Sequence, residues 1–187
     1  MLSYNELKVG TIFIKDGDPY EVLEYNFIRM QQRKPVAQLK IKNLITGKLL
    51  NFTAHQNDSF KEAEIEHIPV KFLYHNRGQY WFCEKDNPKK RFFLTAEILQ
   101  NKQNYLKENI ELKAIKFNEK IINIELPIKI DLKVIEAPPA IKGDTAQGGS
   151  KTVILETGAK INAPLFINEG DIIKINTETG EYVERIN

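Results

Sequence analysis

Turn signals built on glycine recur along the whole chain, and the segments between them have the composition of short β-strands. Four of these signals are Asp16-Gly-Asp-Pro19, Thr46-Gly47, His75-Asn-Arg-Gly78 and Thr179-Gly180. Gly tolerates a positive φ and Pro fixes its own φ, so such clusters reverse the chain. A single helical pattern follows Thr95, which is a predicted N-cap. The sequence therefore predicts an all-β fold with one short helix.

The first third contains a predicted long β-hairpin, formed by residues 20–28 and 35–45. Apolar side chains alternate along both strands and share one face of each strand: Leu23, Tyr25 and Phe27, then Ala37, Leu39 and Ile41. Lys40 and Lys42 lie on the opposite face of the second strand and are displayed together. We expect residues 1–63 to form a small barrel built on this hairpin.

Two further sets of strands follow, with predicted boundaries after residue 63 and at Pro127. Residues 64–127 hold about five strands and the helix, which is the content of a barrel of the OB type. Residues 128–187 hold a second set of five strands. The chain is therefore predicted to fold as three small β-barrel domains in tight succession.

Composition narrows the classes of function. No run of about 18 apolar residues exists and the N-terminus lacks the order of a secretory signal, so we expect a cytoplasmic protein without membrane contact. The single cysteine, Cys83, excludes an internal disulfide and is predicted to be a small core residue. The three histidines have no metal-ligand spacing, and no hydrolase or phosphate-loop motif is present. We expect no metal, no cofactor and no enzymatic activity.

Positive charge is concentrated in one stretch of an otherwise balanced chain. Residues 29–57 contain no Asp or Glu but six basic residues: Arg29, Arg33, Lys34, Lys40, Lys42 and Lys48. A positive field on one hairpin suits a phosphate backbone. The alternative is that these residues protect a sheet edge from pairing with other chains. In the middle third, Tyr80 and Trp81 could stack on bases, although strand alternation must send one of the two inward.

Several segments together resemble bacterial elongation factor P over the whole length of the chain. They are the hairpin end Lys40-Ile-Lys-Asn-Leu-Ile-Thr-Gly47, the loop Gly143-Asp-Thr-Ala-Gln-Gly-Gly-Ser-Lys151, the run from Thr157 to Gly170, and Gly180-Glu-Tyr-Val-Glu-Arg185. The resemblance implies an SH3-like (KOW-type) first domain and two OB-fold domains arranged in an L shape. It also implies a monomeric translation factor that binds the 70S ribosome between the P and E sites.

In that family the factor rescues ribosomes stalled on consecutive prolines by positioning the P-site peptidyl-tRNA. The hairpin reaches the tRNA end and rRNA, and the third domain faces the small subunit and the E-site mRNA. The implied hairpin contacts are Arg29, Gln31, Gln32, Arg33, Lys34, Lys40 and Lys42. The implied contacts of the third domain are Gly143, Asp144, Thr145, Gly148, Gly149 and Lys151, followed by Tyr182 and Arg185. An ordinary barrel loop, and a packed Tyr beside a solvated Arg, remain the alternatives for this domain.

The hairpin tip departs from the family pattern. Many members carry Pro-Gly-Lys-Gly or Pro-Gly-Arg-Gly, in which the Lys or Arg is modified, whereas Gln32 takes the modified position here. Gln has neither the amine nor the guanidinium that those modifications need. Gln32 acts unmodified, or a shifted loop presents Arg33 or Lys34. A tip without Gly that ends at Pro35 is also stiffer, so preorganisation is expected to replace part of the modification.

The alternative functional class is a ribosome-associated or RNA-binding paralogue that keeps the fold but does not rescue polyproline stalls. Translation through a Pro-Pro-Pro insert distinguishes the two classes.

Overall fold

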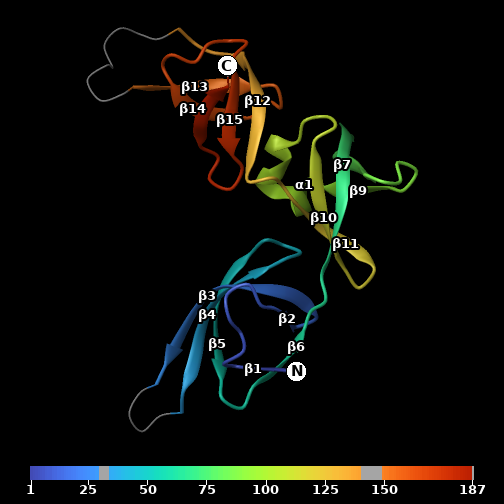
Figure 1. Cartoon of the computed structure of the whole chain (residues 1–187), viewed down its shortest axis with the longest axis vertical. Helices are drawn as coiled ribbons and strands as arrows, with labels where there is room; N and C mark the ends of the chain where they lie inside the picture. The colour runs from blue at the N-terminus through green and yellow to red at the C-terminus, as the bar shows by residue number, and fades with distance from the viewer. Residues whose placement is uncertain (30–33, 140–148, 187) are drawn as a thin grey trace. The chain divides into compact units, whose positions relative to one another are not determined.

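The computed structural model describes residues 1–29, 34–139 and 149–186, and strands dominate it (Figure 1). The strands form three sheets of six, five and five strands, which confirms the predicted all-β class. The chain divides into two compact units, residues 1–68 with 113–124 and residues 69–112 with 125–187. The boundaries after residues 63 and 127 stay predictions. Within the described ranges, no helix is long and apolar enough to cross a membrane.

The first sheet has the strand order β1-β6-β2-β3-β4-β5. Its strands are β1 (Leu2–Ser3), β2 (Ile12–Lys15), β3 (Asp18–Ile28), β4 (Val36–Asn43), β5 (Leu49–His55) and β6 (Ser59–Glu62). Phe13 is fully buried, and its ring contacts the rings of Tyr20, Phe52 and Phe60. The alternation along β4 buries Ala37, Leu39 and Ile41 as predicted. This aromatic and aliphatic core fixes the inner face of the hairpin.

The prediction that Leu23 shares a face of β3 with Tyr25 is wrong. A register shift between Val22 and Glu24 places Leu23 in a β-bulge, and the extra residue reverses the alternation of the strand. Before the bulge, Pro19, Tyr20 and Val22 are the buried residues of β3. After it, Tyr25 lies opposite Leu39 and packs against the core, as the sequence predicted.

The middle sheet has the order β11-β10-β7-β8-β9. Its strands are β7 (Glu66–Asn76), β8 (Gln79–Glu84), β9 (Arg91–Thr95), β10 (Glu111–Phe117) and β11 (Lys120–Glu125). The predicted helix is α1 (Ala96–Leu99), which continues as the 3₁₀ helix η1 (Gln100–Tyr105). Thr95 occupies the N-cap position, but its side chain makes no capping hydrogen bond. Cys83 is buried in β8, as predicted for a core residue.

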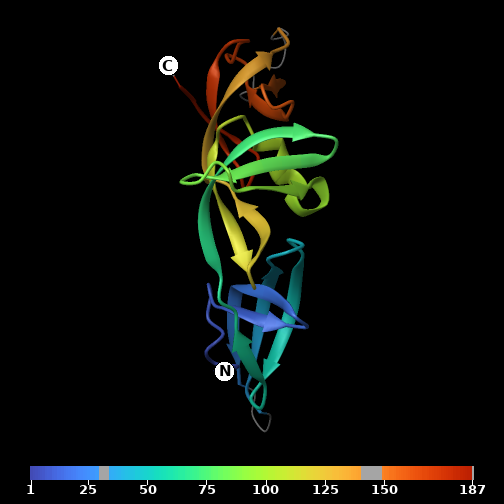
Figure 2. The same cartoon turned by 90° about the vertical axis from the view of Figure 1, so that its right-hand side faces the viewer.

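The third sheet has the order β14-β13-β12-β15-β16. Its strands are β12 (Lys129–Glu136), β13 (Ser150–Leu155), β14 (Lys160–Pro164), β15 (Ile172–Asn176) and β16 (Tyr182–Ile186), and Figure 2 shows them from the side. Inward side chains alternate with exposed ones along β12, where Ile130, Leu132 and Val134 are buried. One face of each strand therefore contributes side chains to the core, and the side chains of the other face are accessible to a binding partner.

Candidate nucleic-acid interface

The hairpin β3–β4 is anchored at its root by two buried asparagines. Asn43 Oδ1 accepts hydrogen bonds from the backbone N–H groups of Ile45 and Thr46, both at 2.9 Å, while its Nδ2 donates to Asp18 Oδ2 at 2.8 Å. Asn123 Nδ2 donates to the carbonyl oxygens of Leu44 and Ile45 at 3.1 and 3.3 Å. Buried amides that satisfy their hydrogen bonds in this way fix local geometry. These hydrogen bonds therefore fix the end of the hairpin that is remote from its tip, which we call its root.

The outer face of the hairpin is polar and its charges are paired across strands. Lys40 Nζ lies 3.0 Å from Glu24 Oε1, and Lys42 lies opposite Glu21 in the register. The stretch 29–57 has no acid in sequence, but β3 brings carboxylates beside it in space. Lys40 therefore has a carboxylate partner that the charge of the stretch alone did not indicate, and its role as a contact stays a prediction. Because both side chains of the Lys40–Glu24 pair are exposed, the pair can open at small cost to meet a ligand.

A shallow hollow of about 360 Å³ lies on this outer face. Strands β3, β4 and β5 line it with mainly polar side chains: Glu24, Asn26, Gln38, Lys40, Asn51 and Thr53. Amide, hydroxyl and ammonium groups can donate hydrogen bonds to phosphate or ribose oxygens. The chemistry of the hollow suits a polynucleotide backbone better than an apolar ligand.

The structure describes the residues on both sides of the hairpin tip. Arg29 follows β3 and Lys34 precedes Pro35 and β4, and both side chains are exposed. The predicted contacts Gln31, Gln32 and Arg33 lie outside the described residues. Two exposed cations, Arg29 and Lys34, thus flank the tip segment in sequence.

The predicted loop of the third domain is described only at its ends. Gly143, Asp144, Thr145 and Gly148 lie outside the described residues, whereas Gly149 leads into β13. Lys151 Nζ donates a hydrogen bond to the carbonyl oxygen of Pro138 at 2.9 Å. This contact joins the two sides of the loop, so Lys151 has a structural partner in addition to any ligand.

Tyr182 and Arg185 lie on the same face of β16, which sequence spacing alone would not predict. A register shift at Val183 puts Tyr182 opposite Ile175 and Arg185 opposite Ile173. Ile173 and Ile175 are two residues apart on β15, so their partners Arg185 and Tyr182 project to the same side of the sheet. The bulge adds the residue that makes Tyr182 and Arg185 three apart in sequence.

The guanidinium of Arg185 lies 5.6 Å from the ring centre of Phe166, and its Nη1 lies 3.7 Å from Asp171 Oδ2. The two contacts hold a half-exposed cation beside Tyr182. Arg185 is thus an exposed cation with two neighbours, and its role in binding stays a prediction.

Comparison with known proteins places this β architecture and its polar hairpin among the translation factors. The family profile described as "Elongation factor P (EF-P) KOW-like domain" matches residues 3–60, and that described as "Elongation factor P, C-terminal" matches residues 130–185. The chain is 37% identical to elongation factor P of Carboxydothermus hydrogenoformans over 100% of both chains. It is 37% identical to that of Moorella thermoacetica, over 99% of this chain and 100% of the relative.

The chain belongs to the elongation factor P family and is thus a translation elongation factor. A solved structure, eukaryotic translation initiation factor 5A from Methanococcus jannaschii, is 16% identical and aligns with a TM-score of 0.48 over 66% of this chain and 94% of that chain.

Proposed function

We propose that this elongation factor binds the ribosome between the P and E sites and stimulates peptide-bond formation at consecutive prolines. Its hairpin is proposed to contact the peptidyl-tRNA end and rRNA, and the factor to act as a cytoplasmic monomer with the three domains 1–63, 64–127 and 128–187. The observation that carries this proposal is the hairpin, whose root is fixed by Asn43 and Asn123 and whose tip is flanked by exposed Arg29 and Lys34.

The hairpin geometry supports a role in positioning. A strand rises about 3.3 Å per residue, so the paired segments from Tyr20 to Ile28 and from Val36 to Asn43 carry the tip on the order of 30 Å from the root. A rigid arm of this kind adds reach without bulk. Holding a reacting tRNA end in the productive geometry lowers an entropic barrier, while the ribosome performs the chemical step.

At the tip, Gln32 is proposed to act unmodified. Its amide donates and accepts hydrogen bonds, and the neighbouring Arg33 supplies charge. The alternative is a modified Arg33 or Lys34. Intact mass of the protein from its own organism, followed by analysis of the tip peptide, tests this point. Unchanged mass supports the proposal, and added mass on Arg33 or Lys34 contradicts it.

The third domain is proposed to face the small subunit and the mRNA in the E site. The loop from Gly143 to Lys151 would approach the mRNA, because glycines allow close contact between backbones. Arg185, held by Phe166 and Asp171 beside Tyr182, would supply a positioned cation for a phosphate.

The test is a translation reporter with and without a Pro-Pro-Pro insert, in cells that have or lack this protein. Deletion is expected to lower expression of the insert reporter and to leave the control reporter unchanged. Equal expression of both reporters would contradict the proposal. It would leave the second candidate, a ribosome-associated or RNA-binding paralogue, which the departure at Gln32 favours.

A further inference from the structure

Three aromatic side chains form a continuous row across β7, β8 and β9, which we call the aromatic row. Tyr74, Trp81 and Phe93 are register partners on these neighbouring strands. The rings of Tyr74 and Trp81 stack with centroids 6.3 Å apart and an interplanar angle of 25°. The centroids of Trp81 and Phe93 are 5.3 Å apart. Because paired residues project to one side of a sheet, the three rings share one face.

A β-bulge in β7 creates this row. Phe72 and Tyr74 are two residues apart and would share the core face of a regular strand. The register shift between them places Leu73 in the bulge and turns Tyr74 to the other side. The sequence left open which of Tyr80 and Trp81 points inward. Tyr80 does, and its ring centre lies 4.3 Å from that of His75. Trp81 belongs to the aromatic row on the other face.

The aromatic row is not required to close the core. The inner face of the same strands already carries Phe72, Phe82 and Leu94, which are at most 4% exposed. On the outer face, 40% of Tyr74 and 45% of Phe93 are accessible to solvent. Trp81 between them is partly buried. Exposed aromatic rings on both sides of it that the core does not need indicate a contact site.

Cations border the aromatic row. Lys71 and Arg91 both pair with Cys83 in the register, so they lie on the face of the aromatic row one step along the sheet, where Cys83 between them is buried. Arg91 Nε donates a hydrogen bond to the carbonyl oxygen of Pro88 at 3.4 Å, and Lys71 Nζ lies 3.4 Å from Glu111 Oε1. These contacts orient two positive groups beside the rings.

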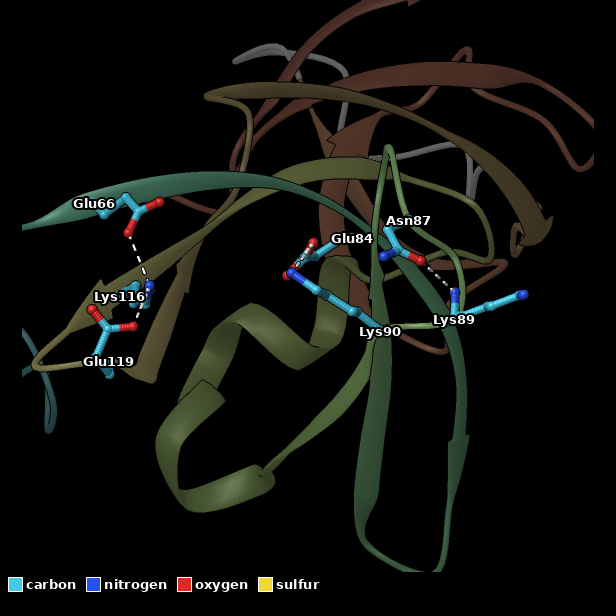
Figure 3. Close-up of polar contacts among 7 residues, drawn as sticks. All are labelled: Glu66, Glu84, Asn87, Lys89, Lys90, Lys116 and Glu119. Carbon is cyan, nitrogen blue, oxygen red and sulfur yellow. Dashed lines mark hydrogen bonds and ion pairs between the residues drawn. The ribbon is translucent and has the colours of Figure 1, made fainter.

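The turn between β8 and β9 adds further positive charge. Lys90 Nζ lies 3.3 Å from Glu84 Oε2, whereas Figure 3 shows the side chain of Lys89 extending away from the turn. Residues 69–95 contain six Lys and Arg against two Asp and Glu, a net charge of +4, which exceeds the +2 of the whole chain. The segment that carries the aromatic row is therefore a second positive part of the chain, after the acid-free stretch 29–57.

We propose that the aromatic row and its bordering cations bind an unpaired stretch of single-stranded RNA. Bases would stack on Trp81 and Phe93, and phosphates would lie near Arg91 and Lys71. Stacking on aromatic rings tolerates any base, and cations supply the salt-dependent part of the affinity. A duplex hides the faces of its bases, so it would not use the rings. This site is separate from the hairpin and does not rest on the function proposed for it.

The experiment uses the fluorescence of Trp81, which is the single tryptophan of the chain. The full-length protein is titrated with a short single-stranded oligouridylate, with duplex RNA of equal length and with inorganic polyphosphate. The single strand is expected to quench the fluorescence, with an affinity that falls as salt rises. Absence of quenching by the single strand, or equal quenching by duplex RNA or polyphosphate, would overturn the proposal.

Variants then locate the site. Phe93→Ala is expected to lower the affinity about tenfold, as for the loss of one stacked base, while Phe93→Tyr retains it. Ile128→Ala removes an exposed apolar side chain elsewhere and is the matched control. Arg91→Gln should reduce the salt dependence, whereas Lys160→Gln, at an exposed position in β14, should not. Equal affinities of Phe93→Ala and Ile128→Ala would refute the assignment.

Discussion

The hairpin β3–β4 and the strands β7, β8 and β9 are both antiparallel ribbons with a buried inner face, yet they present opposite chemistry to solvent. The outer face of the hairpin is polar, and its Lys40 is paired with Glu24. The outer face of β7–β9 carries Tyr74, Trp81 and Phe93 beside a surplus of cations. The first arrangement suits hydrogen bonding to a backbone, and the second suits stacking on bases.

This difference shows that the charge of a segment of sequence does not predict the charge of the sheet surface that the segment forms. The acid-free stretch 29–57 forms β4 and β5, but β3 places Glu24 next to Lys40. In the middle third, acids and bases are mixed along the sequence, yet Lys71 and Arg91 come together beside Cys83. The neighbours of a strand come from other segments, so a run of charge predicts a surface only after the register is known.

The largest expected effect is a loss of stability that differs between the inner and the outer face of β7–β9. Phe82→Ala removes a fully buried ring that contacts Phe72 and Phe92, and it should lower the free energy of unfolding by about 3–5 kcal/mol. Phe93→Ala removes a ring that is 45% exposed and should cost about 1 kcal/mol or less. Urea unfolding followed by circular dichroism measures both. Similar losses for the two variants would mean that the aromatic row belongs to the core.

A middle-sized effect concerns the root of the hairpin. Asn43→Ala removes the acceptor of the hydrogen bonds from the backbone N–H groups of Ile45 and Thr46 and the donor of the hydrogen bond to Asp18, which should cost about 1–3 kcal/mol. Asn51→Ala, on the exposed face of β5, is the matched control and should cost less than about 0.5 kcal/mol. Thermal unfolding compares the two. If Asn43→Ala is as stable as Asn51→Ala, the root does not hold the hairpin.

The smallest effect concerns the carboxylate that holds cations near the aromatic row. The hydrogen bond from Lys85, assisted by Lys71, lowers the pKa of Glu111 below its ordinary value of 4.5. A lowered pKa in the folded state stabilises the protein above pH 4.5, and this contribution is lost as the pH falls through the folded value.

Glu111→Gln should therefore lower the Tm slightly at pH 7, and its difference from wild type should vanish as the pH falls well below 4.5. Glu169→Gln, in an exposed turn, is the control. A difference between Glu111→Gln and wild type that stays constant with pH would show that the ion pairs do not act as described.

Most of the fold was predictable because period-two alternation and glycine turns are local signals. The strand β4, with Ala37, Leu39 and Ile41 buried, follows the pattern directly. The bulges at Leu23, Leu73 and Val183 could not be predicted from the alternating pattern. A bulge adds one residue to one strand, and its place depends on the partner strand, which no local pattern reveals.

The candidate site was predictable in part for the same reason. The exposed positions of Arg29 and Lys34 beside the tip agree with the sequence, but the pairing of Lys40 with Glu24 does not follow from it. The sequence offered Trp81 as a base-stacking residue without showing which face it occupies. The shared register of Tyr74, Trp81 and Phe93 decided that question.

The most direct test of the account measures peptide-bond formation through three consecutive prolines in a purified translation system. Wild-type protein should accelerate this step and leave a message without prolines unaffected. The variant Lys40→Gln with Lys42→Gln, which avoids placing a new carboxylate beside Glu24, should accelerate it less at moderate salt. Absence of acceleration by the folded wild-type protein would contradict the central claim that its hairpin positions the peptidyl-tRNA.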